Sequence, residues 1–331
     1  MVALRKFFIV CLLGVFVFLV GCKKDDKIQI GITQFVDHAA LDRAREGFIK
    51  ALADRGYVED ENIIIEFQSA HGDFANTNLI AETFVSKQVD LIYAIATPSA
   101  QAARNVTEDK DIPVLFSAVT DPVGAGLVES LENPGGNVSG TSDMSPMDKQ
   151  FTLIRNVLGT NKRIGVLYSQ GEQNSIVQVD AIREEAGDDF TIDAVGISDS
   201  ATLQLELEIL LNKVDALFIP TDNLMASNME LIATEALEAG IPVFGTESNH
   251  VLAGALMTEG IDYYDLGYQT GMMAADILDG KVKISELSVE FSEVTKLIIN
   301  LDTARALELE IPQELIDRAT LVEDGEIKND N

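Results

Sequence analysis

The feature that most constrains the fold is one order of strands and helices that occurs twice along the chain. The stretch VDLIYAIATPSAQAARN at residues 89–105 leads from an apolar strand through a polar turn into a helix, and VDALFIPTDNLMASNME at 214–230 repeats that order. Apolar runs of about five to eight residues alternate with amphipathic segments of about twelve to eighteen, which is typical of β-α units and parallel sheets. The sequence therefore predicts two α/β lobes of the same plan, each a Rossmann-like parallel sheet flanked by helices.

The two series match unit for unit. The first places strands at 27–35, 62–70, 90–96 and 112–119, and the second at 163–169, 190–197, 215–220 and 241–247. Amphipathic segments separate the strands in both series. The match extends to short motifs, since Ile-Gly-Ile at 30–32 corresponds to Ile-Gly-Val at 164–166.

The remaining segments predict how the lobes are joined. We expect the run 254–261 and a helix over 263–278 to rejoin the first lobe, and a strand over 289–300 to rejoin the second. Three connections then cross a hinge. The expected division is 28–143 plus 252–283 for lobe 1 and 146–249 plus 288–320 for lobe 2, with a frayed tail over 321–331.

The N-terminus has the pattern of an export signal over residues 1–21. Arg5 and Lys6 precede an uncharged apolar run from 7 to 20, which as a helix spans about 21 Å against the roughly 30 Å of a membrane core. The segment Leu-Val-Gly-Cys at 19–22 resembles a bacterial lipobox, so Cys22 is the expected lipidation site and 22–27 the linker to it. The alternative is an ordinary signal with an incidental cysteine.

Cysteine and histidine usage predicts neither a disulfide nor a metal site. Cys11 leaves with the signal, so the mature chain keeps Cys22 alone. The three histidines, His38, His71 and His250, are too far apart for a spacing motif. We expect no metal and no cofactor.

The chain is strongly acidic, with a net charge of −30. Loss of Arg5 and Lys6 leaves 22 basic and 54 acidic residues, a net charge of −32. This charge repels nucleic acids and anionic lipid surfaces. We therefore expect an extracytoplasmic monomer that is held at the cell membrane by its lipid and has no nucleic-acid partner.

The repeated strand ends are the first candidates for a binding site, because ligands of open parallel sheets lie beyond the carboxyl ends of the strands. Thr97, Pro98 and Ser99 begin a helix there and also fit a plain helix start. Their hydroxyls and the helix N-terminus suit a carboxylate. The second lobe has Thr221, Asp222 and Asn223 at the same place. Asp222 is a good N-cap by itself and is also suited to an ammonium group, so the pair of turns fits a zwitterion.

Other strand ends add polar and aromatic candidates. Phe35 and Tyr168 close equivalent strands and can offer rings to an apolar ligand, or simply cap the local core. The further candidates are Gln34, Thr120, Asp121, Ser142, Asp143 and Glu247. No nucleophile and base are placed by a motif, and no Gly-x-Ser-x-Gly elbow occurs, so we expect no enzymatic activity.

Several segments resemble one known family. They are GITQFVDHAALDRAREGF at 31–48, ATPSAQAA at 96–103, TDPVGAGLVESLENPGGNVSGTSD at 120–143, PTDN at 220–223 and GIPVFGTES at 240–248. They are similar to the substrate-binding lipoproteins of bacterial ABC transporters, in the branch associated with tryptophan, tyrosine and phenylalanine.

The resemblance implies a periplasmic-binding-protein type I fold, hinge closure over a small ligand and delivery to a separate permease and ATPase. It implies cleft residues at Gln34, Thr97, Ser99, Asp121, Ser142, Asp143, Asp222, Asn223 and Glu247. One departure is visible: His38 is followed by Ala39, where the family usually has proline. That change loosens the loop near Phe35 and puts side-chain specificity in question.

Two kinds of function fit these observations. The first is a lipid-anchored receptor that binds an amino acid, expected to be aromatic (Trp, Tyr or Phe), for an ABC importer. The second keeps the fold but makes the protein a sensor that presents its closed form to a membrane receptor or kinase. A nucleoside or a small sugar is a further alternative ligand.

Overall fold

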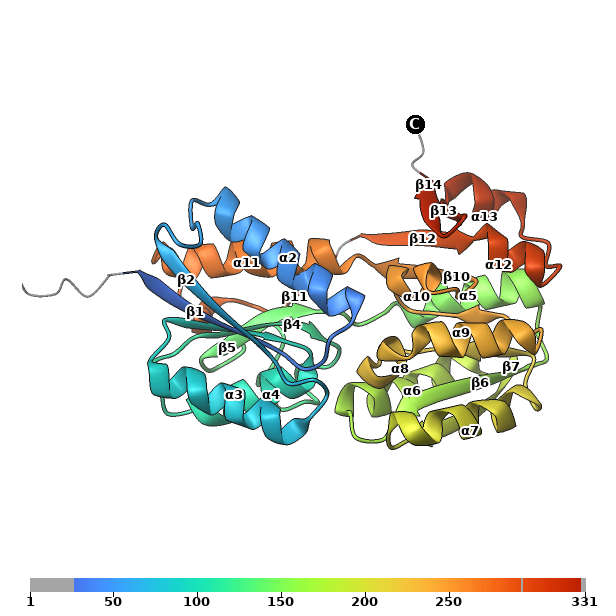
Figure 1. Ribbon diagram of the computed structural model, residues 1–331, viewed down its shortest axis with the longest axis horizontal. Coiled ribbons are helices and arrows are strands. Elements are labelled where there is room, and N and C mark those ends of the chain that lie inside the picture. Colours follow the sequence, from blue (N-terminus) through green and yellow to red (C-terminus); the bar gives the residue numbers. More distant parts are fainter. Residues whose placement is uncertain (1–26, 293, 329–331) are drawn as a thin grey trace, which may run out of the picture.

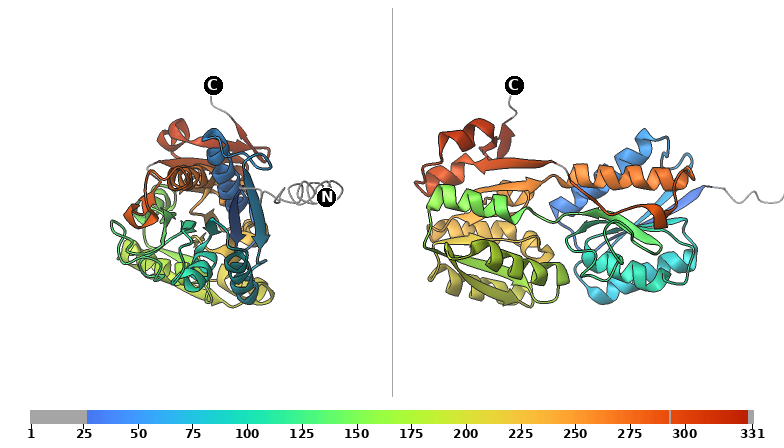
Figure 2. Two further views of the ribbon diagram at one scale, coloured as in Figure 1. Left: turned by 90° about the vertical axis from the view of Figure 1, so that its left-hand side faces the viewer. Right: turned by 180° about the vertical axis from the view of Figure 1, so that it is seen from behind.

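The computed structural model describes residues 27–292 and 294–328. Two lobes lie side by side along the long axis of the molecule, and each is a sheet with helices on both faces (Figure 1). The chain passes between them at three places, after residue 142, at residue 262 and after residue 291 (Figure 2). The lobes can therefore turn about a hinge made of these connections.

Lobe 1 contains a six-stranded sheet in which all pairings are parallel. In spatial order its strands are β11 (Glu290–Phe291), β5 (Val138–Ser142), β4 (Val114–Val119), β3 (Leu91–Ile95), β1 (Ile28–Gln34) and β2 (Ile63–Ser69). Helices α2 (Ala39–Asp54) and α11 (Tyr263–Leu278) pack on one face, and α3 (Phe74–Lys87) and α4 (Thr97–Thr107) pack on the other. A 3-10 turn, η1 (Ile284–Glu286), precedes β11.

Lobe 2 contains an eight-stranded sheet whose pairings are parallel, except that β10 pairs antiparallel with β12 and β13 pairs antiparallel with β14. In spatial order its strands are β14 (Glu326–Lys328), β13 (Thr320–Glu323), β12 (Thr295–Asn300), β10 (Met257–Ile261), β9 (Val243–Phe244), β8 (Ala216–Phe218), β6 (Lys162–Ser169) and β7 (Phe190–Ile197). Its helices are α5 (Met147–Leu158), α6 (Gln173–Ala186), α7 (Ser200–Leu211), α8 (Asn223–Ser227), α9 (Met229–Glu238), α10 (Ser248–Leu252), α12 (Leu301–Ala306) and α13 (Gln313–Arg318).

Three segments differ from the expected division of the chain. Strand β10 lies in the sheet of lobe 2, between β9 and β12, so the expectation that 254–261 rejoins lobe 1 is wrong. The strand is buried inside that sheet because it follows β9 by a short connection through α10, and consecutive elements are usually neighbours. Strand β11 pairs with β5 in lobe 1, although 288–320 was expected in lobe 2.

The predicted frayed tail is also wrong for residues 321–328. Strands β13 and β14 form a hairpin whose turn contains Asp324 and Gly325, both with positive φ. Asp-Gly is a favoured pair for such a two-residue turn. Residues 329–331 lie outside the described part of the chain.

The repeated glycine of the first strands has a packing reason. A methyl group on Gly31 of β1 would lie 2.6 Å from the Phe84 ring of α3. One on Gly165 of β6 would lie 2.8 Å from Leu217 and 2.9 Å from Leu210. In both lobes a neighbouring side chain therefore rests directly on the backbone of the first strand.

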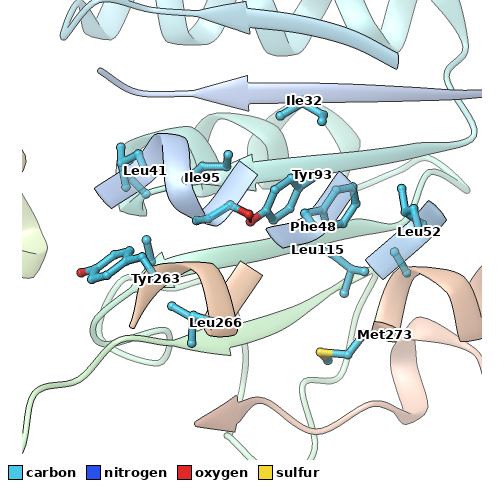
Figure 3. Close-up of a cluster of buried hydrophobic side chains, with 14 of the residues drawn as sticks. Ile32, Leu41, Phe48, Leu52, Tyr93, Ile95, Leu115, Tyr263, Leu266 and Met273 are labelled. Atoms are coloured by element: carbon cyan, nitrogen blue, oxygen red, sulfur yellow. Dashed lines mark hydrogen bonds between the residues drawn. The ribbon is translucent and has the colours of Figure 1, made fainter. Parts of the chain in front are cut away.

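The core of lobe 1 joins the sheet to the pair α2 and α11 (Figure 3). The rings of Phe48 and Tyr93 are stacked, with centroids 3.8 Å apart and planes at 7°. The Tyr93 hydroxyl bonds the Ser117 hydroxyl inside this core. A methyl group on Gly267 of α11 would lie 1.9 Å from the Ala44 carbonyl of α2, so the helices touch through this glycine. This close contact fixes Tyr263, the first residue of α11, at the edge that faces lobe 2.

Candidate functional site

The strand ends of the two lobes meet around a small central cavity. Its volume is about 10 Å³, which is roughly the space of one water molecule. Lobe 1 lines it with His38, Leu41, Ala118, Asp143 and Tyr263, and lobe 2 with Asn174, Thr221, Asp222, Asn223, Ala226 and Glu247. None of these lining residues is Lys or Arg. An amino acid does not fit while the lobes lie this close, so this is a closed arrangement.

Two buried carboxyl groups of lobe 2 lie at the start of α8. Asp222 caps this helix by accepting from the Met225 amide at 2.9 Å, and it also accepts from the Ser169 amide at 2.5 Å. Glu172 accepts from the amides of Asn223 and Leu224 at 3.3 and 3.1 Å. Burial raises the pKa of both groups, and the nearby Asp222 carboxylate helps to raise the pKa of Glu172 to about 7.

A third carboxyl group, Asp143, lies in the first connection between the lobes. It accepts from the hydroxyls of Thr120 at 2.8 Å and Tyr263 at 2.7 Å. Burial raises its pKa to about 6 even though both hydroxyls favour the charged form. The Tyr263 hydroxyl is held protonated, because burial and then the Asp143 charge raise its pKa well above the usual value.

A fourth carboxyl group, Glu247, sits between two imidazoles. One of its oxygens lies 3.0 Å from the Nε2 atom of His250, and the other has no hydrogen-bond partner within the described chain. Burial works against ionisation of Glu247, but His250 and His38 outweigh it and its pKa is lowered. Burial lowers the pKa of His38, so this imidazole is neutral at pH 7.

Two larger spaces flank the central cavity between the lobes. One, of about 300 Å³, is bounded by Phe35 and Phe74 of lobe 1 and by Gly171 and Leu224 of lobe 2. The two phenyl rings lie 5.0 Å apart at 49°, so this space has an aromatic wall. The other, of about 390 Å³, lies between the 37–39 loop and helices α8 to α10.

The structure brings five of the predicted site residues to the central cavity: Asp143, Thr221, Asp222, Asn223 and Glu247. Phe35 lies on the wall of the aromatic space. Thr120 reaches the cavity only through its bond to Asp143.

The other predicted residues lie near the cleft but have local partners or local packing. Gln34 bonds the Val36 carbonyl and the Asp42 carboxylate and accepts from Arg45. Ser142 donates to the Thr120 carbonyl, and Asp121 accepts from the Gly124 amide. Tyr168 packs against the core of lobe 2.

The start of α4 holds Thr97, Pro98 and Ser99, all buried and none of them on the cavity wall. Thr97 does not cap the helix, because the N-cap position is Ala96. The Thr97 hydroxyl has no partner within the described chain. Ala96 has φ +80° and ψ 154°, a conformation that costs a non-glycine residue on the order of 1–3 kcal/mol.

Sequence reasoning missed Glu172, Asn174 and Tyr263. Glu172 and Asn174 follow β6, whose end was recognised only through Tyr168. Tyr263 follows β10, the strand that was expected in the other lobe. The sequence signal for these three residues is the same as for Asp222, namely a polar residue just after a parallel strand. This signal can be used only when each strand is assigned to the correct sheet.

Among residues 27–292 and 294–328, no helix has the length and apolar character needed to cross a membrane. The same residues contain no group of three or more His, Cys, Asp or Glu side chains arranged to hold a metal ion. The predicted signal over 1–21 and the predicted lipidation site Cys22 lie outside the described residues.

Comparison with known proteins identifies the family. The sequence pattern of the family described as ABC transporter substrate binding protein matches residues 29–323. The chain belongs to this family. Its members are extracytoplasmic solute-binding proteins and not enzymes, which confirms the resemblance found in the sequence. A protein of Clostridioides difficile (strain R20291) named tyrosine-binding protein is 47% identical over 291 residues, which cover 87% of this chain and 84% of that protein.

Solved structures of this substrate-binding family show the same fold. A domain from Streptococcus pneumonia in complex with L-Trp matches with a TM-score of 0.85 and 33% identity, over 90% of this chain and all of that one. A substrate-binding protein with adhesive properties from Clostridium difficile, in a ligand-free open form, matches with a TM-score of 0.69 and 46% identity, over 89% of this chain and 99% of that one. More distant structures, 14% to 17% identical, share the fold, so the predicted type I fold class is confirmed.

The two TM-scores agree with a closed arrangement of this substrate-binding protein. The open protein is the more similar in sequence but the less similar in shape. A different angle between two otherwise similar lobes produces this combination.

Proposed function

We propose that this protein is the lipid-anchored solute-binding component of an ABC importer and that it binds an aromatic amino acid, Trp, Tyr or Phe, between its lobes. One observation carries the proposal. Four buried carboxyl groups, Asp143, Glu172, Asp222 and Glu247, gather where the lobes meet, and no Lys or Arg from the described part of the chain lines the central cavity. Such a cluster favours a cation, because each buried negative charge is costly without a positive partner.

The ammonium group of an amino acid is the cation that fits this family. We place it against Asp222, whose oxygens keep free lone pairs after accepting two amides. The ligand carboxylate lies toward Thr97 and Ser99 at the start of α4. The helix N-terminus there favours an anion, as does the buried Thr97 hydroxyl, which has no partner among the described residues. The aromatic ring lies toward Phe35 and Phe74.

The closed cavity requires that the ligand enters while the lobes are apart. A ligand that contacts both walls binds the closed form more tightly and so shifts the population toward it. The permease then recognises the closed lobes. The relative named tyrosine-binding protein and the L-Trp complex support an aromatic amino acid as the ligand.

The ligand is tested by a thermal-melt screen of residues 23–331 against the twenty amino acids, nucleosides and sugars. A ligand at 100 times its Kd adds about 2.7 kcal/mol to stability, a shift of a few degrees. The chain contains no tryptophan, so fluorescence excited at the red edge of the spectrum reports bound Trp directly. Shifts confined to Trp, Tyr or Phe support the proposal, and shifts only with sugars or nucleosides contradict it.

The anchor and the importer need a separate test in cells. A Cys22→Ser variant should move from the membrane fraction to the soluble fraction without losing ligand binding. Deletion of the permease that this protein serves should abolish uptake of the labelled amino acid. Uptake that persists without a permease would favour the sensor function instead.

A further inference from the structure

One hydrogen bond links the lobes in front of the central cavity. The Nε2 atom of His38 in lobe 1 lies 3.3 Å from the Oδ1 atom of Asn223 in lobe 2. His38 is the N-cap residue of α2, but its side chain makes no capping bond. An N-cap is usually Ser, Thr, Asp or Asn. The imidazole therefore extends across the cleft and leaves its own helix uncapped.

The partner side chain is oriented from within lobe 2. The Asn223 amide nitrogen donates to Glu172 at 2.5 Å. Above its pKa of about 7, Glu172 is a carboxylate that only accepts, so it keeps the NH₂ group of Asn223 toward itself and leaves the amide oxygen toward lobe 1. Glu172 is itself held in place by the two amides that start α8.

This orientation dictates the state of the imidazole. An amide oxygen only accepts, so the Nε2 atom of His38 must carry the hydrogen. Burial lowers the pKa of His38 and so keeps the ring neutral. A neutral imidazole has a single N–H hydrogen, so its tautomer decides which ring nitrogen donates. The direction of the bond across the cleft thus follows from a carboxylate on the far side of Asn223.

We propose that Glu172, Asn223 and His38 form a latch that holds the lobes closed, in which Glu172 is a positioning residue that sets the direction of the hydrogen bond across the cleft. His38 and Asn223 lie on the wall of the central cavity, and the hydrogen bond between them requires no contact with a ligand. The latch rests on the proposed function in one respect only, namely that binding of a ligand is the reason why the lobes close. A net hydrogen bond of ordinary strength changes the ratio of closed to open molecules by about fivefold.

The first experiment measures the distance between the lobes without any ligand. In a Cys22→Ser background the mature chain has no cysteine, so Glu82→Cys on α3 and Glu208→Cys on α7, both exposed, accept spin labels. We expect His38→Ala and Asn223→Ala each to lower the closed-to-open ratio about fivefold, and the double variant to lower it no further.

The matched control is His71→Ala. This histidine also lies at the mouth of the cleft, but it pairs with Asp37 of its own lobe at 2.5 Å. Its removal should leave the distance distribution unchanged. Unchanged distances in His38→Ala or Asn223→Ala, or an equal change in His71→Ala, would overturn the latch.

The second experiment reads the positioning role of Glu172 by nitrogen NMR of the imidazoles at pH 8. The chain has three histidines, so the signals are simple to assign. We expect His38 as the Nε2–H tautomer, and we expect this fraction to fall in Glu172→Gln, because a glutamine can donate to the Asn223 oxygen and reverse the bond. A tautomer that does not respond to Glu172→Gln would overturn the positioning role. Neither experiment uses an amino acid, so a wrong ligand assignment does not affect them.

Discussion

Two turns at equivalent positions, residues 96–99 in lobe 1 and 220–223 in lobe 2, show how one fold plan supports different chemistry. Each turn leads from the third strand of its series into a helix at the cleft. In lobe 1 the Thr97 hydroxyl is buried and finds no partner within residues 27–292 and 294–328, and Ala96 has a positive φ. In lobe 2 Asp222 accepts two backbone amides and lines the central cavity. The repeat determines the positions of these residues, but the side chains at equivalent positions differ in chemical type.

The same contrast extends to the whole cleft. Lobe 2 contributes three buried carboxyl groups, Glu172, Asp222 and Glu247, whereas the described part of lobe 1 has a single buried one, Asp143, with two hydroxyl donors. Lobe 1 supplies the aromatic pair Phe35 and Phe74. We infer that lobe 2 holds the ammonium group of the ligand, whereas lobe 1 holds its carboxylate and sets the shape of the space for its side chain.

The largest effect is expected from Asp222→Ala. Removal of one partner of a buried charge pair costs about 2–5 kcal/mol, so affinity for the amino acid should fall on the order of 100-fold or more. The ligand-free protein should lose less, because loss of the cap is offset by relief of repulsion with Glu172. Titration calorimetry and urea unfolding separate the two effects.

Asp73→Ala is the matched control for that variant. Asp73 caps α3 by accepting from the amides of Ala75 and Asn76, at the surface of lobe 1. Its loss should cost about 1 kcal/mol of stability and leave affinity unchanged. Equal affinity losses in both variants would mean that Asp222 acts only through its helix.

The sequence predicts the two lobes well because their signals are local. The alternation of apolar runs and amphipathic segments gives β7 at 190–197, and the repeat gives the equivalence of the sheets. The membership of β10 in lobe 2 depends on pairing with β12, nearly forty residues later, and no local pattern encodes it. The hairpin at Asp324 and Gly325 did have a local signal, but the acidic composition of the tail obscured it.

The site is less predictable than the fold, because its key contacts join distant residues. Asp222 follows a strand and is found by position alone. The bond from Asn223 to His38 spans 185 positions and that from Tyr263 to Asp143 spans 120. Such pairs become visible only when both lobes are in place.

The next effect is a pH dependence of stability carried by the buried carboxyl groups. In the unfolded chain Asp143 and Glu172 ionise near pH 4, whereas in the folded protein burial raises the pKa of Asp143 to about 6 and that of Glu172 to about 7. Between these values the folded state binds more protons, so the free energy of unfolding should fall as pH rises from about 4.5 to 7 and then level off. His38 opposes this slope, because burial lowers its pKa.

Asp143→Asn isolates one contribution to that slope. The variant should lack the fall in the free energy of unfolding that ionisation of Asp143 causes between about pH 4 and 6, which is at most about 3 kcal/mol. The ligand-free variant should therefore be more stable than the wild type at pH 8 and nearly equal to it at pH 4. Urea unfolding at both pH values tests this. If the free energy of unfolding of the variant changes with pH in the same way as that of the wild type, ionisation of Asp143 does not destabilise the folded protein.

A smaller effect of opposite sign is expected in lobe 1 from Thr97→Val. The change removes a buried hydroxyl that has no partner in the part of the chain that the structure describes. The ligand-free protein should therefore gain about 1 kcal/mol of stability, while affinity for the amino acid falls severalfold. Thr107→Val in the same helix is the control, because the Thr107 hydroxyl donates to Ala103 and accepts from Asn137. That variant should be destabilised. A loss of stability in Thr97→Val would mean that the hydroxyl is satisfied in solution.

The smallest effect is expected from Ala96→Gly, which tests whether the turn in lobe 1 stores strain that the turn in lobe 2 does not. Relief of the positive φ gains about 1–3 kcal/mol, and the extra freedom of glycine in the unfolded chain offsets about 0.5–1 kcal/mol. The net gain in stability expected in thermal melts therefore starts from about zero. Ala75→Gly in α3 should instead destabilise by up to about 1 kcal/mol. If the strain also orients the start of α4 toward a ligand, Ala96→Gly should bind the amino acid more weakly although it is more stable. A variant that gains both stability and affinity would mean that the strain has no part in binding.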